Sequence, residues 1–197
     1  MALKHKSLVA FSVALLVTAG VGTFVYIYEI PPLIYNIWEQ AIVQKGLGGG
    51  PIPVNTLWTE PSLPGASLTK TNPLAAGANL DTLYTVGVLD LSKGPEILSV
   101  PSIAGRYYDI ELVDSRGDDF AYVGSRTTGG QAGSFLISGP GWQGTLPGGV
   151  TQIASPDNEV LLIGRVLVQN DSEVSTVYGL SEQIHLTPLS DWQPAAG

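Results

Sequence analysis

The apolar pattern begins with an uncharged run from Ser7 to Tyr28, which is 22 residues long. As a helix this run would span about 33 Å at ~1.5 Å per residue, close to a hydrocarbon core of roughly 30 Å. Lys4 and Lys6 precede it and Glu29 follows it, which predicts the N-terminus inside and the C-terminal domain outside. A cleaved signal peptide is the alternative, but the run exceeds a typical apolar region of about 7–15 residues. We therefore predict a retained single-pass anchor in a plasma-type membrane over residues 1–29.

The apolar spacing then changes to that of a short amphipathic helix over residues 33–45, ending at Gly46. Its predicted apolar stripe is formed by Leu33, Ile34, Ile37, Trp38, Ala41 and Ile42. The stripe would lie on the membrane surface or on the domain that follows. Glycines and prolines fill residues 46–53, which is typical of a linker. Residues 30–53 are thus expected to join the anchor to that domain.

From residue 54 onward, short runs of β-branched and aromatic residues alternate with Gly, Pro and Asp turn signals. Seven strands are predicted, at residues 81–91, 96–100, 106–114, 119–125, 134–138, 150–154 and 159–169. Residues 58–78 are rich in Pro, Ser, Thr and Gly and are predicted to be irregular and extended. Strands at this spacing favour an antiparallel sandwich or barrel. The predicted ectodomain covers residues 54–190, and residues 191–197 form a tail.

One helix is predicted at the end of this domain. Asn170 can cap it, and Glu173 stands at the capping-box position. Apolar residues then recur at helical spacing from Val174 to Ile184, and Thr187-Pro188 would end the helix. His185, the only histidine beyond the N-terminal tail, would lie near the helix end, where the dipole favours a cation.

Composition excludes several function classes. The net charge is −8, charged residues make up 13% of the chain, and its few cations are scattered, so the basic stripe of a nucleic-acid-binding protein is missing. With no cysteine, disulfides and thiolate chemistry are excluded. Serine catalysis would depend on His185, and the sequence has no Gly-x-Ser-x-Gly elbow. No metal or cofactor is expected, because the acidic group at residues 111–119 reads as an ordinary hairpin rather than a calcium loop.

A series of short motifs in a fixed order resembles the domain of unknown function family numbered 1254. They are the segments at residues 79–84, 89–95, 100–101, 106–108, 120–124, 126–129, 139–142 and 164–165. The resemblance covers roughly residues 54–189 and implies a jelly-roll β-sandwich. Larger relatives carry a second sandwich, of the family numbered 1214, which this chain does not show. The resemblance therefore implies a separate anchored protein with that second sandwich as a partner, while homo-oligomers are also open.

A polar group near the start of the first long strand is the candidate ligand site. Its members are Asn79, Asp81, Tyr84, Arg106, Tyr108 and Arg126. An arginine fork could hold a carboxylate or a sugar, whereas the alternative is a structural Asp–Arg pair and turn caps. Trp142, in a Gly-Pro-Gly-Trp loop, is either a sugar platform, an interface anchor or a plug for the sandwich. Arg165 stands among apolar residues and is expected to face outward or to pair with an aspartate.

Two functions remain open from these observations. The first is an anchored assembly module without enzymatic activity that docks a complementary sandwich protein. The second is an extracytoplasmic carbohydrate-binding or small-ligand protein, or a hydrolase, whose site would be the polar group. The first predicts an exposed apolar patch, and the second predicts a concave pocket lined by the polar group.

Overall fold

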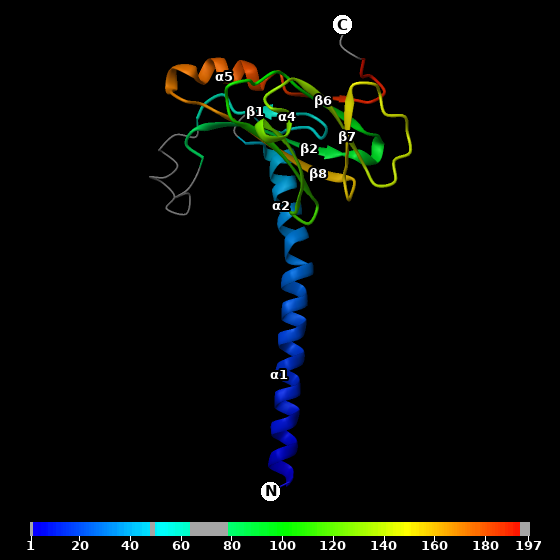
Figure 1. Cartoon of the computed structure of the whole chain (residues 1–197). Helices are drawn as coiled ribbons and strands as arrows, with labels where there is room; N and C mark the ends of the chain where they lie inside the picture. Colours follow the sequence, from blue (N-terminus) through cyan, green and yellow to red (C-terminus); the bar gives the residue numbers. More distant parts are fainter. Residues whose placement is uncertain (1, 48–49, 64–78, 194–197) are drawn as a thin grey trace.

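The chain forms a β-sandwich head on a long helical shaft (Figure 1). A computed structural model describes residues 2–47, 50–63 and 79–193, with side chains described from residue 10 onward. Most of the extended segment predicted at residues 58–78, part of the predicted linker and the end of the tail lie outside the described residues.

Two sheets make up the sandwich. The first has five strands in the order β1-β2-β8-β4-β5, and the second has four in the order β7-β6-β3-β9. The strands are β1 (Trp58–Thr59), β2 (Thr82–Asp90), β3 (Glu96–Val100), β4 (Tyr108–Asp114), β5 (Asp119–Gly124), β6 (Gly133–Ser138), β7 (Val150–Ala154), β8 (Glu159–Leu167) and β9 (His185–Pro188). A sandwich is confirmed, but the expectation of a purely antiparallel one was wrong, because β6 and β7 are parallel.

All seven predicted strands are present, as β2 to β8. The sequence did not reveal β1, which pairs with β2, or β9, which pairs with β3. The placement of His185 near a helix end was wrong, since this residue begins β9 and is exposed there.

The helix predicted near the C-terminus is present but short. It consists of a 3-10 turn, η3 (Asp171–Glu173), followed by α5 (Val174–Ser181). The predicted capping box is absent, because the Asn170 side chain caps no backbone N–H of this helix. Its Oδ1 accepts from the Ser172 hydroxyl instead, and the Glu173 carboxylate accepts from Arg106. Two further short elements are η2 (Leu91–Lys93) and α4 (Ser125–Thr128).

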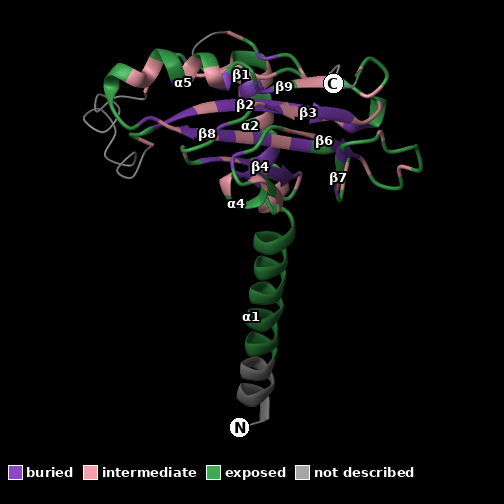
Figure 2. Ribbon diagram, turned by 45° about the horizontal axis from the view of Figure 1, so that its top comes forward, coloured by how far each residue is buried: buried purple, intermediate pink, exposed green. Residues whose placement is uncertain are grey.

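The main core lies between the two sheets (Figure 2). Buried and less buried positions alternate along β8, whereas β2 is buried on both of its faces. On β2, for example, Leu83 and Leu89 face this core, whereas Val86 and Val88 belong to a second apolar cluster on the opposite side of the sheet. The five-stranded sheet therefore has an inner face against the other sheet and an outer face with its own apolar contacts. A third cluster, with Ile97 and Leu136, lies on the outer side of the four-stranded sheet.

Helices α1 (Ala2–Tyr28) and α2 (Ile30–Lys45) follow each other as one nearly straight shaft (Figure 1). The prolines at 31 and 32 do not break it, because they occupy the first turn of α2, where a missing N–H costs little. The Glu29 N–H still donates to the Val25 carbonyl, and the Leu33 N–H to the Glu29 carbonyl. Residues 10–45 are long and apolar enough to cross a membrane, a property that a signal sequence shares.

The upper end of α2 packs on the outer face of the five-stranded sheet. Ile42 is buried against Ile52, Val86 and Val88, and Tyr35 is buried about two turns earlier on the same side of the helix. The predicted linker is therefore partly docked, since the Ile52 N–H also donates to the Ile42 carbonyl at 3.3 Å.

Most residues of the predicted apolar stripe of α2 do not pack on the head. Ile42 alone among its six members is buried, whereas Leu33, Ile34 and Ile37 are 54%, 49% and 59% exposed. Below, these three residues are called the exposed stripe. Trp38, also exposed, lies between the stripe and the sheet.

Candidate functional site

Strand register arranges charged and aromatic residues in a row across the outer face of the five-stranded sheet. Tyr84 pairs with Arg165 across β2 and β8, and Arg165 pairs with Asp109 across β8 and β4. Glu60, just after β1, extends the row, since its N–H donates to the Tyr84 carbonyl at 2.8 Å. Below, Glu60, Tyr84, Arg165 and Asp109 are called the polar row.

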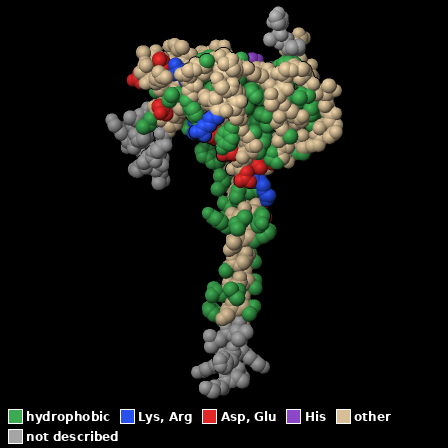
Figure 3. Space-filling view, viewed as in Figure 1, with side chains coloured by type: hydrophobic (Ala, Val, Ile, Leu, Met, Phe, Trp, Pro, Cys, Tyr) green, Lys and Arg blue, Asp and Glu red, His purple; other side chains and the backbone are tan. Residues whose placement is uncertain are grey.

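Arg165 is the centre of the polar row and its cation. Its guanidinium donates to the carboxylate of Glu111, which lies one strand away on β4. An arginine in an apolar strand must be paired or face outward. A pair with an aspartate was one of the expected alternatives, and the partner is instead a glutamate, Glu111. Figure 3 shows acidic and basic side chains side by side on the lower part of the head, next to the shaft.

Three buried polar atoms of the row have no hydrogen-bond partner among the described residues. They are Glu60 Oε2, Asp109 Oδ1 and Arg165 Nε. Buried polar groups are normally paired, so two unpaired acceptors and one unpaired donor in one row are an arrangement that the stability of the sheet alone does not explain. Burial also raises the pKa values of the Glu60 and Glu111 carboxyl groups.

An apolar groove of about 480 Å³ borders the polar row on one side, between α2 and the sheet. Its apolar and aromatic lining residues are Trp38, Ile42, Leu47, Trp58, Tyr84, Val86, Leu161 and Ile163. Glu60 and Arg165 complete the lining. Such a volume falls within the range of small-molecule sites, roughly 300–1,000 Å³. Below, this feature is called the α2 groove.

A second, more polar hollow of about 510 Å³ borders the row on its other side. Tyr84 and Arg165 line both hollows, and the second is completed by Asn79, Leu80, Asp81, Thr82, Tyr107 and Leu167. The polar row is thus the boundary between an apolar space and a polar one. This arrangement suits the binding of a molecule with unlike ends.

The structure brings three of the seven predicted site residues together, namely Asn79, Asp81 and Tyr84. Asn79 has a structural task as well, because its Oδ1 accepts from the Thr82 N–H at 2.9 Å and from the Thr82 hydroxyl at 2.7 Å. Asp81 is exposed, and its carbonyl accepts from the Val168 N–H at 2.7 Å.

The other four predicted residues lie elsewhere, so the seven do not form one site. Arg106 donates to the Leu167 carbonyl at 2.6 Å and to Glu173 at 2.9 Å, which ties the start of β4 to the end of β8. Tyr108 is fully buried in the core, with its hydroxyl 2.6 Å from that of Thr128.

Arg126 is exposed on the short helix α4. Trp142 packs on the cluster around Ile97 and Leu136, on the outer side of the four-stranded sheet. Neither residue lines the hollows at the polar row.

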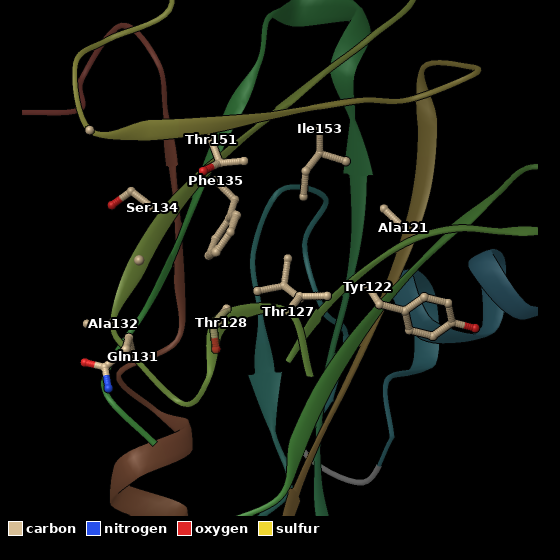
Figure 4. Close-up of a pocket in the computed structure, with 13 residues that line it drawn as sticks. Ala121, Tyr122, Thr127, Thr128, Gln131, Ala132, Ser134, Phe135, Thr151 and Ile153 are labelled. Carbon is tan, nitrogen blue, oxygen red and sulfur yellow. The ribbon is translucent and has the colours of Figure 1, made fainter. Parts of the chain in front are cut away.

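A lateral cleft of about 440 Å³ opens where β5 separates from β6 and β7. Figure 4 shows Phe135, Ile153 and Thr127 pointing toward one another there, while the Tyr122 ring points away. No charged residue lines this cleft. The Thr127 hydroxyl is already bonded to the backbone of Gly124, so the cleft presents mainly apolar contact and little chemistry.

Catalytic chemistry has little support among the described residues. His185 lies on β9, outside both hollows at the polar row, and its Nδ1 is 2.9 Å from the Gln183 carbonyl oxygen. The described residues include no group of three or more His, Asp and Glu placed to hold a metal ion. Asp114, one of the acids in the predicted hairpin, accepts from the Arg116 and Asp118 N–H groups and so shapes the turn.

Sequence reasoning missed four members of this site: Trp38 as a groove residue, Trp58, Glu60 and Glu111. Glu60 stands beside Pro61 in a segment that shows no strand period. Its place in the row depends on the pairing of β1 with β2. Within the polar row, the sequence itself gave a signal for Tyr84, through its motif, and for Arg165, a charge inside an apolar strand.

Comparison with solved structures finds a similar fold in a protein from Vibrio parahaemolyticus. The VPA0106 protein from Vibrio parahaemolyticus is 27% identical, with a TM-score of 0.66 over 84% of this chain. The chain spans 37% of that protein. A putative uncharacterized protein from Burkholderia cenocepacia is 10% identical, with a TM-score of 0.44. The match covers 71% of this chain and 36% of the Burkholderia chain.

Comparison with curated proteins found no match. A family model described as "Protein of unknown function (DUF1254)" matches residues 54–188. The matched region begins shortly before β1 and ends with the last residue of β9, and so includes the whole sandwich. The chain therefore belongs to the DUF1254 family.

Proposed function

We propose that this protein is a membrane-anchored, extracytoplasmic sandwich module that assembles with a second anchored sandwich protein. The exposed stripe of α2 carries the proposal. The anchor, the height of the stripe above the membrane and the comparison with VPA0106 support it in turn.

A retained anchor accounts for the surface of the shaft. Every described residue of α1 from Ala10 to Tyr28 is exposed to solvent, and most are apolar. A soluble protein rarely exposes a contiguous apolar surface of this extent, whereas a bilayer would cover it. Lys4 and Lys6 before the run favour an N-terminus on the cytoplasmic side, which places the head outside.

The exposed stripe lies too far from the anchor for the bilayer to cover all of it. With Tyr28 at the hydrocarbon boundary, Leu33 stands about 7 Å and Ile37 about 13 Å farther along the helix, at ~1.5 Å per residue. The polar headgroup region adds only about 5–7 Å on each side. Ile37 would therefore meet water unless a protein covers it.

A second anchored chain is the partner that fits this position. Two helices held in one membrane with the same orientation run parallel, and apolar residues three and four apart, as in the stripe, form a suitable seam. VPA0106 carries a large part that has no counterpart in these 197 residues, because this chain spans 37% of it. We propose that a separate anchored protein, with the family 1214 sandwich that the resemblance implies, supplies the equivalent of that part.

Purification of the tagged full-length protein from its native host in mild detergent, with mass spectrometry of what accompanies it, tests the proposal. The double variant Leu33→Gln and Ile37→Gln makes the stripe polar while keeping good helix formers. The matched control, Asn36→Ala and Gln40→Ala, changes two exposed α2 residues outside the stripe.

We expect a stoichiometric anchored sandwich protein with the wild type and the control, and at least a tenfold loss of it with the stripe variant. Recovery of the chain alone would contradict the proposal. If the only co-purified protein is a second copy of this chain, the proposed hetero-assembly is replaced by a homo-oligomer. If the stripe variant recovers as much partner as the wild type does, the exposed stripe is not the interface.

A further inference from the structure

Two neighbouring hollows, one mainly apolar and one of mixed and more polar lining, share a wall at Tyr84 and Arg165. The α2 groove is lined mainly by apolar and aromatic side chains, with charge only along one side. The second hollow is lined by polar groups such as Asn79, Asp81 and Thr82. A ligand that fills both needs an apolar part and a polar part joined at the polar row, which is the chemistry of an amphiphile.

The size of the α2 groove favours a single-chain molecule. Its volume of about 480 Å³ is that of a site for one small ligand. The groove also lies above the membrane rather than in it, because Trp38 stands about 15 Å beyond Tyr28 along the helix. A free amphiphile would therefore enter from the aqueous side.

The charges around the row favour an uncharged head group. Arg165 pairs with Glu111, faces Asp109 across the strands and lines the groove together with Glu60. An anionic head group would meet these carboxyl groups, whereas burial raises the pKa of Glu60 and Glu111 and so weakens their attraction for a cationic one. Like charges at short range oppose binding.

Hydroxyl groups match the mixed polar groups of the groove wall. A hydroxyl both donates and accepts, so a head group with several can bond both to the Glu60 carboxyl group and to the Arg165 guanidinium that line the groove. The rings of Trp38, Trp58 and Tyr84 also line the groove, and aromatic faces combine apolar contact with a polar edge.

We propose that the α2 groove and the polar row bind a free single-chain amphiphile with an uncharged, hydroxyl-rich head group, such as an alkyl glycoside. The alkyl chain lies between α2 and the outer face of the sheet, and the head group meets Glu60 and Arg165. This site uses none of the residues of the exposed stripe, so it stands or falls independently of the proposed assembly.

Equilibrium dialysis of three labelled amphiphiles with the same chain tests the head group. The probes are octyl glucoside, octanoate and octylammonium, each below its critical micelle concentration, against full-length protein in lipid nanodiscs. Binding to empty nanodiscs is subtracted. We expect saturable binding of octyl glucoside, at least tenfold tighter than that of the other two.

Three variants test the place of binding. Ile163→Phe fills the groove and is expected to weaken octyl glucoside binding at least tenfold, and Glu60→Gln removes an acceptor oxygen and is expected to weaken it several-fold. The control, Leu146→Phe, enlarges an exposed apolar residue that does not line the groove and should bind as the wild type does. Near-ultraviolet circular dichroism confirms that each variant is folded.

Several outcomes would overturn the proposal. Equal uptake of all three probes by the wild type and Ile163→Phe would indicate partition into the nanodisc only. Preference for octanoate or octylammonium would show that the head-group chemistry is wrong. Wild-type affinity in both folded Ile163→Phe and Glu60→Gln would place the binding elsewhere.

Discussion

Glu96 makes the stability of the head depend on pH. It is the first residue of β3, is 3% exposed, and its Oε2 has no hydrogen-bond partner among the described residues. Burial, and to a smaller extent the neighbouring Asp191 carboxylate, raises the pKa of Glu96 from 4.5 to about 7. The folded protein therefore holds this proton more tightly than the unfolded chain does.

The sign and size of the effect follow from this difference. Below about pH 4.5 the carboxyl group is neutral in both states and costs no stability. As the pH rises from about 4.5 to about 7, the unfolded chain gives up this proton while the folded protein keeps it, so stability is lost over this range and levels off above it. The difference between 4.5 and about 7 corresponds to about 3 kcal/mol once Glu96 is fully ionised.

Glu96→Gln removes the charge and keeps the shape of the neutral side chain. We expect the variant to match the wild type at pH 4 and to be more stable by about 3 kcal/mol at pH 8. Urea unfolding of the full-length protein in micelles, followed by tryptophan fluorescence from pH 4 to pH 8, measures this. Glu159→Gln, at an exposed position of β8, is the control. A Glu96→Gln variant that keeps the wild-type pH dependence, or is less stable at pH 8, would refute the reasoning.

Arg165→Ala leaves Glu111 without its cation and should lower the free energy of unfolding by about 1–3 kcal/mol. Adding Glu111→Gln should restore part of the loss in the same urea assay; no restoration would mean that packing, not charge, is what Arg165 provides. Gly87→Ala places a methyl group 2.6 Å from a Leu57 methyl carbon, so we expect a loss of about 1–3 kcal/mol. Gly179→Ala, in α5 with open space around it, should raise stability by about 0.5–1 kcal/mol; equal thermal melting shifts in the two alanine variants would contradict the steric argument.

Local pattern was enough to predict most of the sandwich. Strands β2 to β8 are runs of five or more residues between turn signals, and α5 has apolar residues at helical spacing. The two missed strands are short, with two residues in β1 and four in β9. They are strands because their neighbours β2 and β3 offer pairing edges, which a short segment does not encode by itself.

The candidate site could not be predicted to the same degree because it depends on register. Tyr84 and Arg165 are adjacent only through the pairing of β2 with β8, and Glu111 reaches Arg165 through the pairing of β8 with β4. These contacts join residues that are far apart in the sequence, and a shift of one residue would send each side chain to the other face. Sequence motifs placed Asn79, Asp81 and Tyr84 correctly near each other but grouped them with Arg106 and Tyr108, which have structural partners.

The unbroken shaft fixes the azimuth of the head, meaning the direction in which each of its faces looks around the membrane normal. Each residue of an α-helix turns the chain by about 100°. One residue inserted between Tyr28 and Tyr35 would therefore rotate the head by that angle relative to the part of α1 that the proposal places in the membrane. Seven inserted residues would nearly restore the original direction at a height about 10 Å greater. For a chain anchored by α1 as proposed, a partner held in the same bilayer would meet the head in one fixed direction as well as at one fixed height.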